Sequence, residues 1–400
     1  MRMTFGGSYA GVIGACVGGQ FLDGYFIAAA GFIIADLYAD PSVSVEVASL
    51  VAAAYALGAL VGAGLLSGLA DYFGRRSLLL GSMSVIAVSA IGIAGIGNPY
   101  VLVAGQFVLG MMLGADMPAG QAMVTEFVDP ARRTSALTTL MCGWFVGALF
   151  AVGAIFALKY CGAFWPSIFA VGAVLAGVSL VLRYPMPESE LWRHVRRRRL
   201  LLGQWREMYR SATARRAVVF CSFFWLCQII PVSVMMFYAP MILGQLTGTN
   251  DVYVHLALLY AFFLVGVLPA GRVKDRFIGY VLWGSFAVMG SALIGFALFG
   301  EKLPTVTAAC FICYALAYGL QTSLNYVLPN RMFETELRSC AVGFVGAISR
   351  IGSITCVLAV PHLLLVTGAQ GILLLAAIVS FAGVICVRLL PAEFSAGARR

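Results

Sequence analysis

Apolar residues occur along this chain in long runs, and the short segments between them carry most of the charges and turn residues. Runs of this length with few charges are typical of membrane-spanning helices. Inside a bilayer they must be helical, because an α-helix satisfies its own backbone hydrogen-bonding groups. The sequence therefore predicts an all-α membrane protein with spans at residues 9–35, 45–69, 77–96, 100–127, 135–158, 162–183, 217–246, 252–271, 279–299, 304–328, 340–366 and 369–390.

Composition supports this class. Hydrophobic residues make up 61% of the 400 residues and charged residues only 11%, whereas soluble domains carry about 25% charged residues. The three histidines are scattered, and most of the ten cysteines sit inside apolar runs. We therefore expect neither a disulfide framework nor a metal site.

The distribution of basic residues predicts the orientation. In a twelve-span map with the N-terminus inside, Lys159 and Lys302 fall in outside loops, Arg350 falls within a span, and the other basic residues fall in inside segments. Such an excess of Lys and Arg is typical of cytoplasmic loops. We expect a multi-pass protein of the bacterial inner membrane with both termini in the cytoplasm.

The chain divides into two similar halves. A basic loop at 184–216 separates an N-terminal bundle of six helices, 1–183, from a C-terminal one, 217–400. We read the loop as a solvated cytoplasmic linker. An offset of 205 residues places Glu126 over Arg331 and Arg133 over Arg338. The sequence therefore predicts two pseudo-symmetric six-helix bundles with a substrate site between them.

Two acids lie deep within the predicted spans, and the same offset pairs them with polar residues. Asp23 maps onto Gln228, and Asp116 maps onto Gln321. A charge at the centre of a bilayer costs at least ~2.5 kcal/mol, which makes it a candidate for function. We expect all four residues to line one central cavity and the two acids to carry protons. The alternatives are a structural acid at Asp23 and a fixed salt bridge at Asp116, for instance to Arg350.

Further polar residues in the spans are candidates for substrate contact. Arg350 could bind an anionic substrate, neutralise an acid, or only extend toward the cytoplasmic side. Asn325 follows Gln321 by four residues and so shares its helix face. Tyr25 is a third candidate, although helix-to-helix hydrogen bonding is an equally good explanation for such residues.

The turn after span two reads GLADYFGRRSLLL (68–80). It resembles the signature of the major facilitator superfamily, an Asp followed by Gly-Arg-Arg. The resemblance implies a latch that closes the cytoplasmic ends of the helices, with the Asp at a helix N-terminus, where a negative charge is favoured. The residues that we assign to this cytoplasmic gate are Asp71, Gly74, Arg75, Arg76, Glu126, Arg133 and Glu188.

Other motifs resemble two branches of that superfamily. The stretch 227–243, with Gln228 and Tyr238 in register, is similar to span seven of sugar porters, as are the turns at 125–133 and 183–193. The stretches 21–32 and 114–127 resemble proton-coupled symporters of metabolites, phosphate and aromatic acids. These resemblances add Tyr238 to the candidate substrate-binding residues.

The sequence thus favours secondary active transport of a small polar metabolite, sugar-like or an organic acid, by alternating access with proton symport. The alternatives are proton-antiporting efflux of drugs or metabolites and a non-transporting nutrient receptor. An enzyme is not expected, because no nucleophile–base or metal constellation is visible. We expect the proton gradient as the energy source, no cofactor, protons, a small molecule and membrane lipids as partners, no nucleic acid, and a monomer.

Overall fold

The structure is a computed structural model that describes residues 9–39, 45–163, 165–195, 209, 212–247, 252–299, 303–333 and 338–388. All of its regular elements within these ranges are helices. They are α1 (Tyr9–Ala39), α2 (Val45–Val61), η2 (Gly62–Leu66), α3 (Ser67–Phe73), α4 (Arg75–Ile96), α5 (Pro99–Phe127), η3 (Pro130–Arg132), α6 (Arg133–Tyr160), α7 (Pro166–Arg183), α8 (Glu190–Val195), α10 (Ala212–Thr247), α11 (Val252–Val267), η5 (Leu268–Arg272), η6 (Asp275–Phe277), α12 (Ile278–Phe299), α13 (Pro304–Met332) and α14 (Arg338–Arg388).

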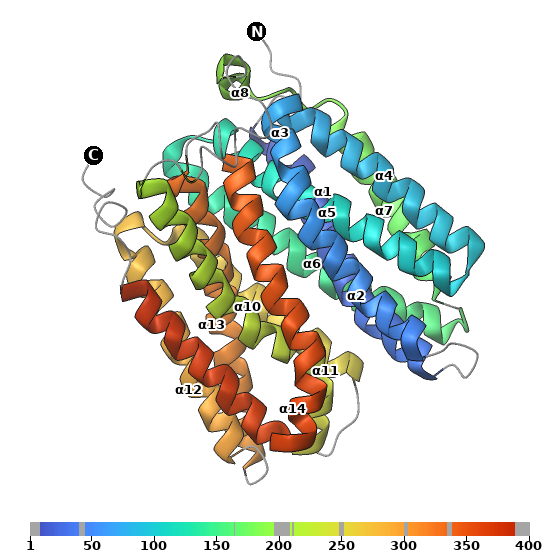
Figure 1. Ribbon diagram of the computed structural model, residues 1–400, viewed down its shortest axis with the longest axis vertical. Helices are drawn as coiled ribbons and strands as arrows, with labels where there is room; N and C mark the ends of the chain where they lie inside the picture. Colours follow the sequence, from blue (N-terminus) through green and yellow to red (C-terminus); the bar gives the residue numbers. More distant parts are fainter. Residues whose placement is uncertain are drawn as a thin grey trace.

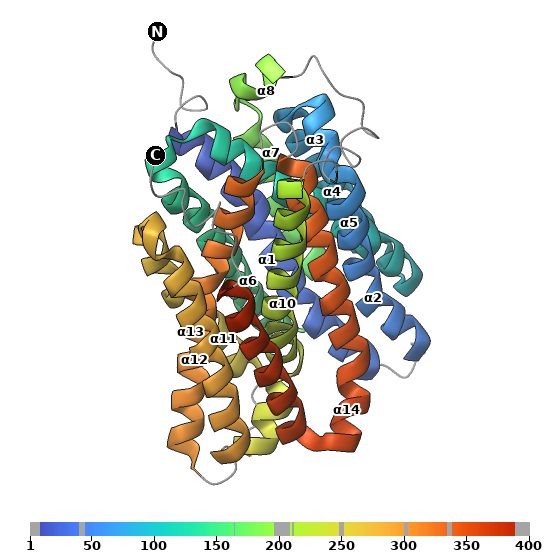
Figure 2. The same ribbon diagram turned by 60° about the vertical axis from the view of Figure 1, so that its left-hand side comes forward.

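The helices form two bundles that stand side by side (Figure 1). Helices α1 to α7 pack on one another, as do α10 to α14. Contacts between the bundles are made mainly by α14 with α2, α3, α5 and η2, and by α6 with α11, α13 and η5. The bundles come together at the end that carries α3 and α8 (Figures 1 and 2), which we call the basic end. Their ribbons diverge toward the other end (Figure 1).

The spans agree with those predicted. Among the described residues, 11 helices are long and apolar enough to cross a membrane, and Leu256–Arg272 is a shorter apolar helix. Helix α14 runs through both of the last two spans, but its backbone turns at Gly368, where φ is 66°. Glycine tolerates this left-handed conformation without steric cost, so the chain reverses there and yields a twelve-span protein.

Span two contains one turn of π-helix, η2. Such turns are uncommon and often lie at functional sites. The turn is rich in small residues, and a Cβ at Gly343 of α14 would overlap the carbonyl oxygen of Ala63. Small residues therefore let α14 approach this turn closely, which brings the two bundles together beside the central pocket.

Candidate functional site: a polar pocket between the bundles

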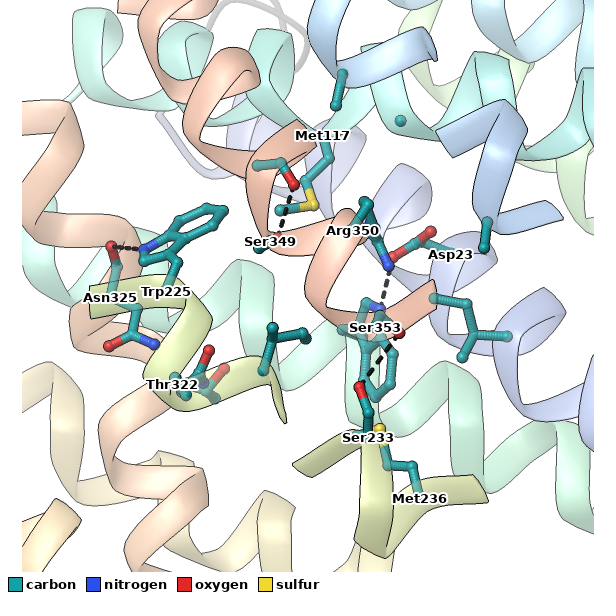
Figure 3. Close-up of a pocket in the computed structure, with 18 of the residues that line it drawn as sticks. Asp23, Met117, Trp225, Ser233, Met236, Thr322, Asn325, Ser349, Arg350 and Ser353 are labelled. Carbon is teal, nitrogen blue, oxygen red and sulfur yellow. Dashed lines mark hydrogen bonds between the residues drawn. The ribbon is translucent and has the colours of Figure 1, made fainter. Parts of the chain in front are cut away.

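A pocket with a volume of about 130 Å³ lies between the two bundles. Its walls are largely aromatic and aliphatic, with a small set of polar side chains (Figure 3). Such a combination is typical of small-molecule sites, in which a few polar groups fix the orientation of the ligand. The principal polar residues are Asp23, Tyr55, Gln228, Ser233, Thr322, Asn325, Ser349, Arg350 and Ser353, and the large apolar ones are Met117, Met141, Trp144, Phe145, Trp225 and Met236.

Asp23 of α1 is held by two donors from neighbouring helices. The Tyr55 hydroxyl donates to Oδ1 at 2.7 Å, and the Trp144 indole N–H donates to Oδ2 at 2.7 Å. Asp23 is only 3% exposed. Each carboxylate oxygen thus has a partner, which compensates part of the cost of burying an acid.

Arg350 of α14 provides positive charge in the same region. Both Asp23 and Arg350 act electrostatically on Tyr55, and Figure 3 shows the two side chains on one side of the pocket. Among the described residues that line the pocket there is thus one acid and one cation, one from each bundle.

Two amide side chains in the pocket have free hydrogen-bonding capacity. Asn325 is 1% exposed, yet neither atom of its side-chain amide has a partner among the described residues, nor does Nε2 of Gln228. Buried polar groups are normally satisfied. These amides are therefore available to a polar ligand.

Asp23, Gln228, Asn325 and Arg350 line this pocket as predicted, but three other candidates do not. Asp116, Gln321 and Tyr25 are buried elsewhere. The Tyr25 hydroxyl donates to the carbonyl oxygen of Ile168 at 2.7 Å, within the N-terminal bundle. The expectation that four pseudo-symmetric polar residues line one cavity is thus correct for Asp23 and Gln228 and wrong for Asp116 and Gln321.

Tyr238 is the last of the predicted substrate contacts. It belongs to α10, but its side chain lies outside the described residues.

Asp116 instead forms a buried ion pair with Arg183, the last residue of α7. Arg183 Nη2 donates to Asp116 Oδ2 at 2.9 Å, and its other nitrogens donate to the carbonyl oxygens of Ala15 and Leu79. The Ser82 hydroxyl donates to Asp116 Oδ1 at 2.6 Å. The pair therefore connects α1, α4, α5 and α7 within the N-terminal bundle.

This arrangement corrects the assignment of charges from the sequence. The sequence places Arg183 beside the basic inside loop and leaves Arg350 as the only cation within a span. Arg183 is in fact fully buried, with 0% of its surface exposed. The partner that the sequence suggests for Asp116 is Arg350, but the residue that pairs with it is Arg183.

A charge cluster at the basic end matches most of the predicted gate. Arg75 is fully buried and pairs with Asp71 and, at 3.0 Å, with Glu126. Glu188 accepts the backbone N–H groups of Arg75 and Arg76 at the start of α4, where a negative charge is favoured. A Cβ at Gly74, which has a φ of 114°, would overlap this carboxylate, so glycine is needed at the turn.

Arg133 behaves differently from the expectation. Its Nε donates to the carbonyl oxygen of Val128 at 3.4 Å, and it forms no ion pair that reaches Asp71 or Glu188 among the described residues. Its pseudo-symmetric counterpart Arg338 contacts Glu126 instead, at 3.6 Å. Arg338 begins α14 and therefore brings its charge from the opposite bundle.

Contacts between the bundles close the basic end. Asp71 Oδ2 accepts the N–H of Cys340 near the start of α14 at 2.9 Å, and Asn330 donates to Gln121 at 3.1 Å. Arg331 donates to the hydroxyl of Thr134 at 2.9 Å. We call this set of polar contacts, together with Glu126–Arg338, the latch.

Replacement of Asp71 by Asn is expected to open the latch. The hydrogen bond that the Cys340 N–H donates across the bundles loses its charged acceptor; a hydrogen bond to a charged group contributes about 1.5–3 kcal/mol, so the open population should rise by about tenfold or more. Cys340 lies in the latch and is 1% exposed. Maleimide labelling of Cys340, resolved by mass spectrometry, should accelerate by a comparable factor.

Cys16 inside the N-terminal bundle is 2% exposed and serves as the internal reference for global unfolding. Asp129→Asn, at an exposed acid, is the matched control variant. Unchanged labelling of Cys340 in Asp71→Asn would show that Asp71 does not hold the basic end closed.

Two bundles of membrane-spanning helices around an internal polar pocket define a polytopic membrane transporter rather than an enzyme. The family model described as "Major Facilitator Superfamily" matches residues 16–333, and the chain belongs to this superfamily. It is therefore a secondary transporter that works by alternating access.

Individual relatives have low sequence identity to this chain but match most of its length. The inner membrane metabolite transport protein YgcS of Escherichia coli (strain K12) is 26% identical, with 95% of this chain and 90% of that protein covered. The 4-hydroxybenzoate transporter PcaK of Pseudomonas putida is 26% identical, with 84% and 81% covered. The structure of the proton:xylose symporter XylE bound to 6-bromo-6-deoxy-D-glucose superposes with a TM-score of 0.81 at 16% identity, covering 96% of this chain and 95% of that one.

The residues that sequence reasoning missed are Tyr55, Trp144 and Arg183. The two aromatic residues stand in apolar runs, where nothing distinguishes them from core residues. Arg183 stands at the edge of a basic loop, where a positive charge needs no other explanation. A search of the predicted spans for hydrogen-bond donors able to reach each buried acid could have found them.

Proposed function

We propose that this transporter takes up a small organic acid with an aromatic or hydroxylated body, together with a proton. The observation that carries the proposal is the presence of Arg350 and Asp23 in one largely apolar pocket that also contains aromatic rings. Arg350 can bind a carboxylate, and the ring of the substrate can pack on Trp144, Trp225 and Phe145. Asn325 and Gln228 can form hydrogen bonds with the hydroxyl groups of the substrate.

The same two charges suggest how substrate and proton are coupled. In the empty pocket the positive charge of Arg350 helps to compensate an ionised Asp23. A substrate carboxylate bound to Arg350 would remove that compensation and place a second anion nearby, which disfavours the charged form of Asp23. Loading of an anion therefore promotes uptake of a proton, and the low polarity of the site strengthens the effect.

The direction of transport follows from the orientation that the basic residues predict. We propose that the basic end is cytoplasmic, with both termini on that side of a bacterial inner membrane, so that the closed latch makes this an outward-facing form. The relative YgcS, whose name places it in the inner membrane, supports this location. The energy source would be the proton gradient, and the working unit a monomer in contact with lipid.

A sugar-like or polyol substrate is the second candidate. The hydroxyl and amide groups of Ser233, Gln228 and Asn325 favour it, and the fold is shared with a xylose symporter. Arg350 would then serve only to balance Asp23.

Binding of matched acid and amide ligands distinguishes the two candidates. We expect 4-hydroxybenzoate to stabilise the purified protein against heat, because a ligand that binds only the folded form shifts unfolding by mass action. Its amide should bind roughly 10- to 100-fold more weakly, as should 4-hydroxybenzoate itself to Arg350→Gln, since a hydrogen bond to a charged group is lost in each case.

Two variants control this measurement. Arg388→Gln removes an arginine on the same helix that stacks on Trp283 away from the pocket, and it should bind like the wild type. Gln228→Ala should weaken binding but keep the preference for acid over amide. Stabilisation by xylose or inositol, with no response to either aromatic ligand, would reject the organic-acid assignment in favour of the second candidate.

A further inference from the structure

Asp23 has one hydrogen-bond donor on each oxygen, and the two donors differ in chemistry. An indole N–H can only donate, whereas a phenolic hydroxyl can donate or accept. Trp144 of α6 occupies Oδ2, and Tyr55 of α2 occupies Oδ1. Of the titratable and charged groups near it, Tyr55 bonds this carboxylate directly, and Arg350 of the other bundle lines the same pocket.

This difference determines where a proton can go. A proton on Oδ2 would find no acceptor in the indole, and it would leave the N–H of Trp144 donating to a hydroxyl oxygen, which is a poorer acceptor than a carboxylate or carbonyl oxygen. A proton on Oδ1 needs only a rotation of the Tyr55 hydroxyl, which then accepts the hydrogen bond from Asp23 that it formerly donated. The Trp144 bond survives in this second arrangement, with the neutral acid carbonyl as its acceptor.

We propose that Tyr55 and Trp144 are the positioning residues for proton binding: the proton enters on Oδ1 as the Tyr55 hydrogen bond reverses, while Trp144 favours the ionised form of Asp23. The proton enters from the pocket, binds Oδ1 and later leaves from the same oxygen. No other covalent bond forms or breaks. This inference rests on the proposed proton coupling at Asp23 and adds the two residues that set its protonation.

Trp144 also connects this carboxylate to the C-terminal bundle, because it bonds Asp23 and its ring contacts a helix of that bundle. Its ring lies 6.2 Å from that of Tyr260 on α11, in an edge contact, and the adjacent Phe145 packs on Phe263 at 5.5 Å. Hydrogen bonds to an ionised acceptor are about twice as strong as neutral ones. Protonation of Asp23 therefore loosens Trp144, the residue whose ring contacts the C-terminal bundle.

Infrared difference spectroscopy tests the proposal without relying on transport. The carbonyl band of protonated Asp23 is identified as the band that Asp23→Asn removes, and its intensity is followed against pH. In Trp144→Phe the ionised form loses a donor, so the midpoint should move to higher pH by about one unit. Trp283→Phe is the control, because it also removes an indole N–H but at a ring that stacks against Arg388 away from the pocket. Its midpoint should stay that of the wild type.

Tyr55→Phe gives a second reading if Trp144→Phe does not fold. It removes a donor to the ionised form and an acceptor for the protonated form; because the bond to the ionised form is the stronger one, its midpoint should also rise, by less than that of Trp144→Phe. The proposal is overturned if a folded Trp144→Phe or Tyr55→Phe titrates like the wild type, or if the wild type shows no band that depends on Asp23. If the midpoints move as expected but wild-type uptake ignores an imposed pH gradient, the coupling fails while the roles of Tyr55 and Trp144 stand.

Discussion

Substitution of Asp23 by Asn is expected to abolish proton-driven accumulation while leaving substrate exchange across the membrane largely intact. Asn cannot exchange a proton, but it keeps an acceptor for Trp144, and the Tyr55 hydroxyl can turn to accept from its amide. With one proton per substrate, a gradient of one pH unit supports up to about tenfold accumulation, and the variant should reach only equilibrium. The assay is uptake and counterflow in proteoliposomes.

The matched control is Gln228→Ala, which changes another polar residue of the same pocket that does not titrate. It should lower the apparent affinity and still accumulate substrate against a gradient. Normal accumulation by Asp23→Asn would remove Asp23 from the coupling mechanism and leave it a structural acid.

Loss of one partner of the Asp116–Arg183 pair is expected to produce the largest loss of stability. Arg183→Gln would leave a buried carboxylate without its cation, and breaking a buried pair from one side costs about 3–5 kcal/mol. Gly19 makes the site tight, because a Cβ there would overlap Asp116 and Arg183, so little space exists for water to compensate. Thermal unfolding in detergent measures the effect.

The double variant Asp116→Asn with Arg183→Gln removes both charges together and should recover much of the loss, because no unpaired charge remains buried. Asp129→Asn, at an exposed acid, should melt like the wild type. A single variant Arg183→Gln as stable as the wild type would show that the pair does not hold the N-terminal bundle together. Because Asp116 is engaged in this ion pair, we propose Asp23 as the proton-coupling residue. We expect Asp116 to have the structural role of holding helices of the N-terminal bundle together.

The helices could be predicted from the sequence because the bilayer imposes one simple rule on each span. The length of an apolar run predicts a membrane span, and the excess of basic residues in alternate loops predicts on which side of the membrane each loop lies. The charge cluster around Arg75 could be predicted for a related reason, since Gly74 with its neighbouring charges forms a local turn. Even there, the exchange of Arg133 for Arg338 as the partner of Glu126 was not visible, because it depends on contact with the other bundle.

The face of each helix that lines the pocket was harder to predict than the residues at which the helix begins and ends. Asp116 and Met117 are adjacent on α5, but successive residues on an α-helix point about 100° apart. Met117 lines the pocket and Asp116 does not. Because α5 is apolar on nearly all sides, its sequence carries no stripe that says which face meets the other bundle. The same holds for Gln321 on α13 beside Thr322, which does line the pocket.

Substrate-driven proton movement in proteoliposomes of the wild-type protein is the most direct test of proton-coupled uptake. With no imposed gradient, addition of an organic acid that binds should alkalinise the weakly buffered external medium as protons enter with the substrate. Asp23→Asn should transfer substrate in exchange without any such change. Wild-type uptake of the same acid with no accompanying proton movement would contradict the account.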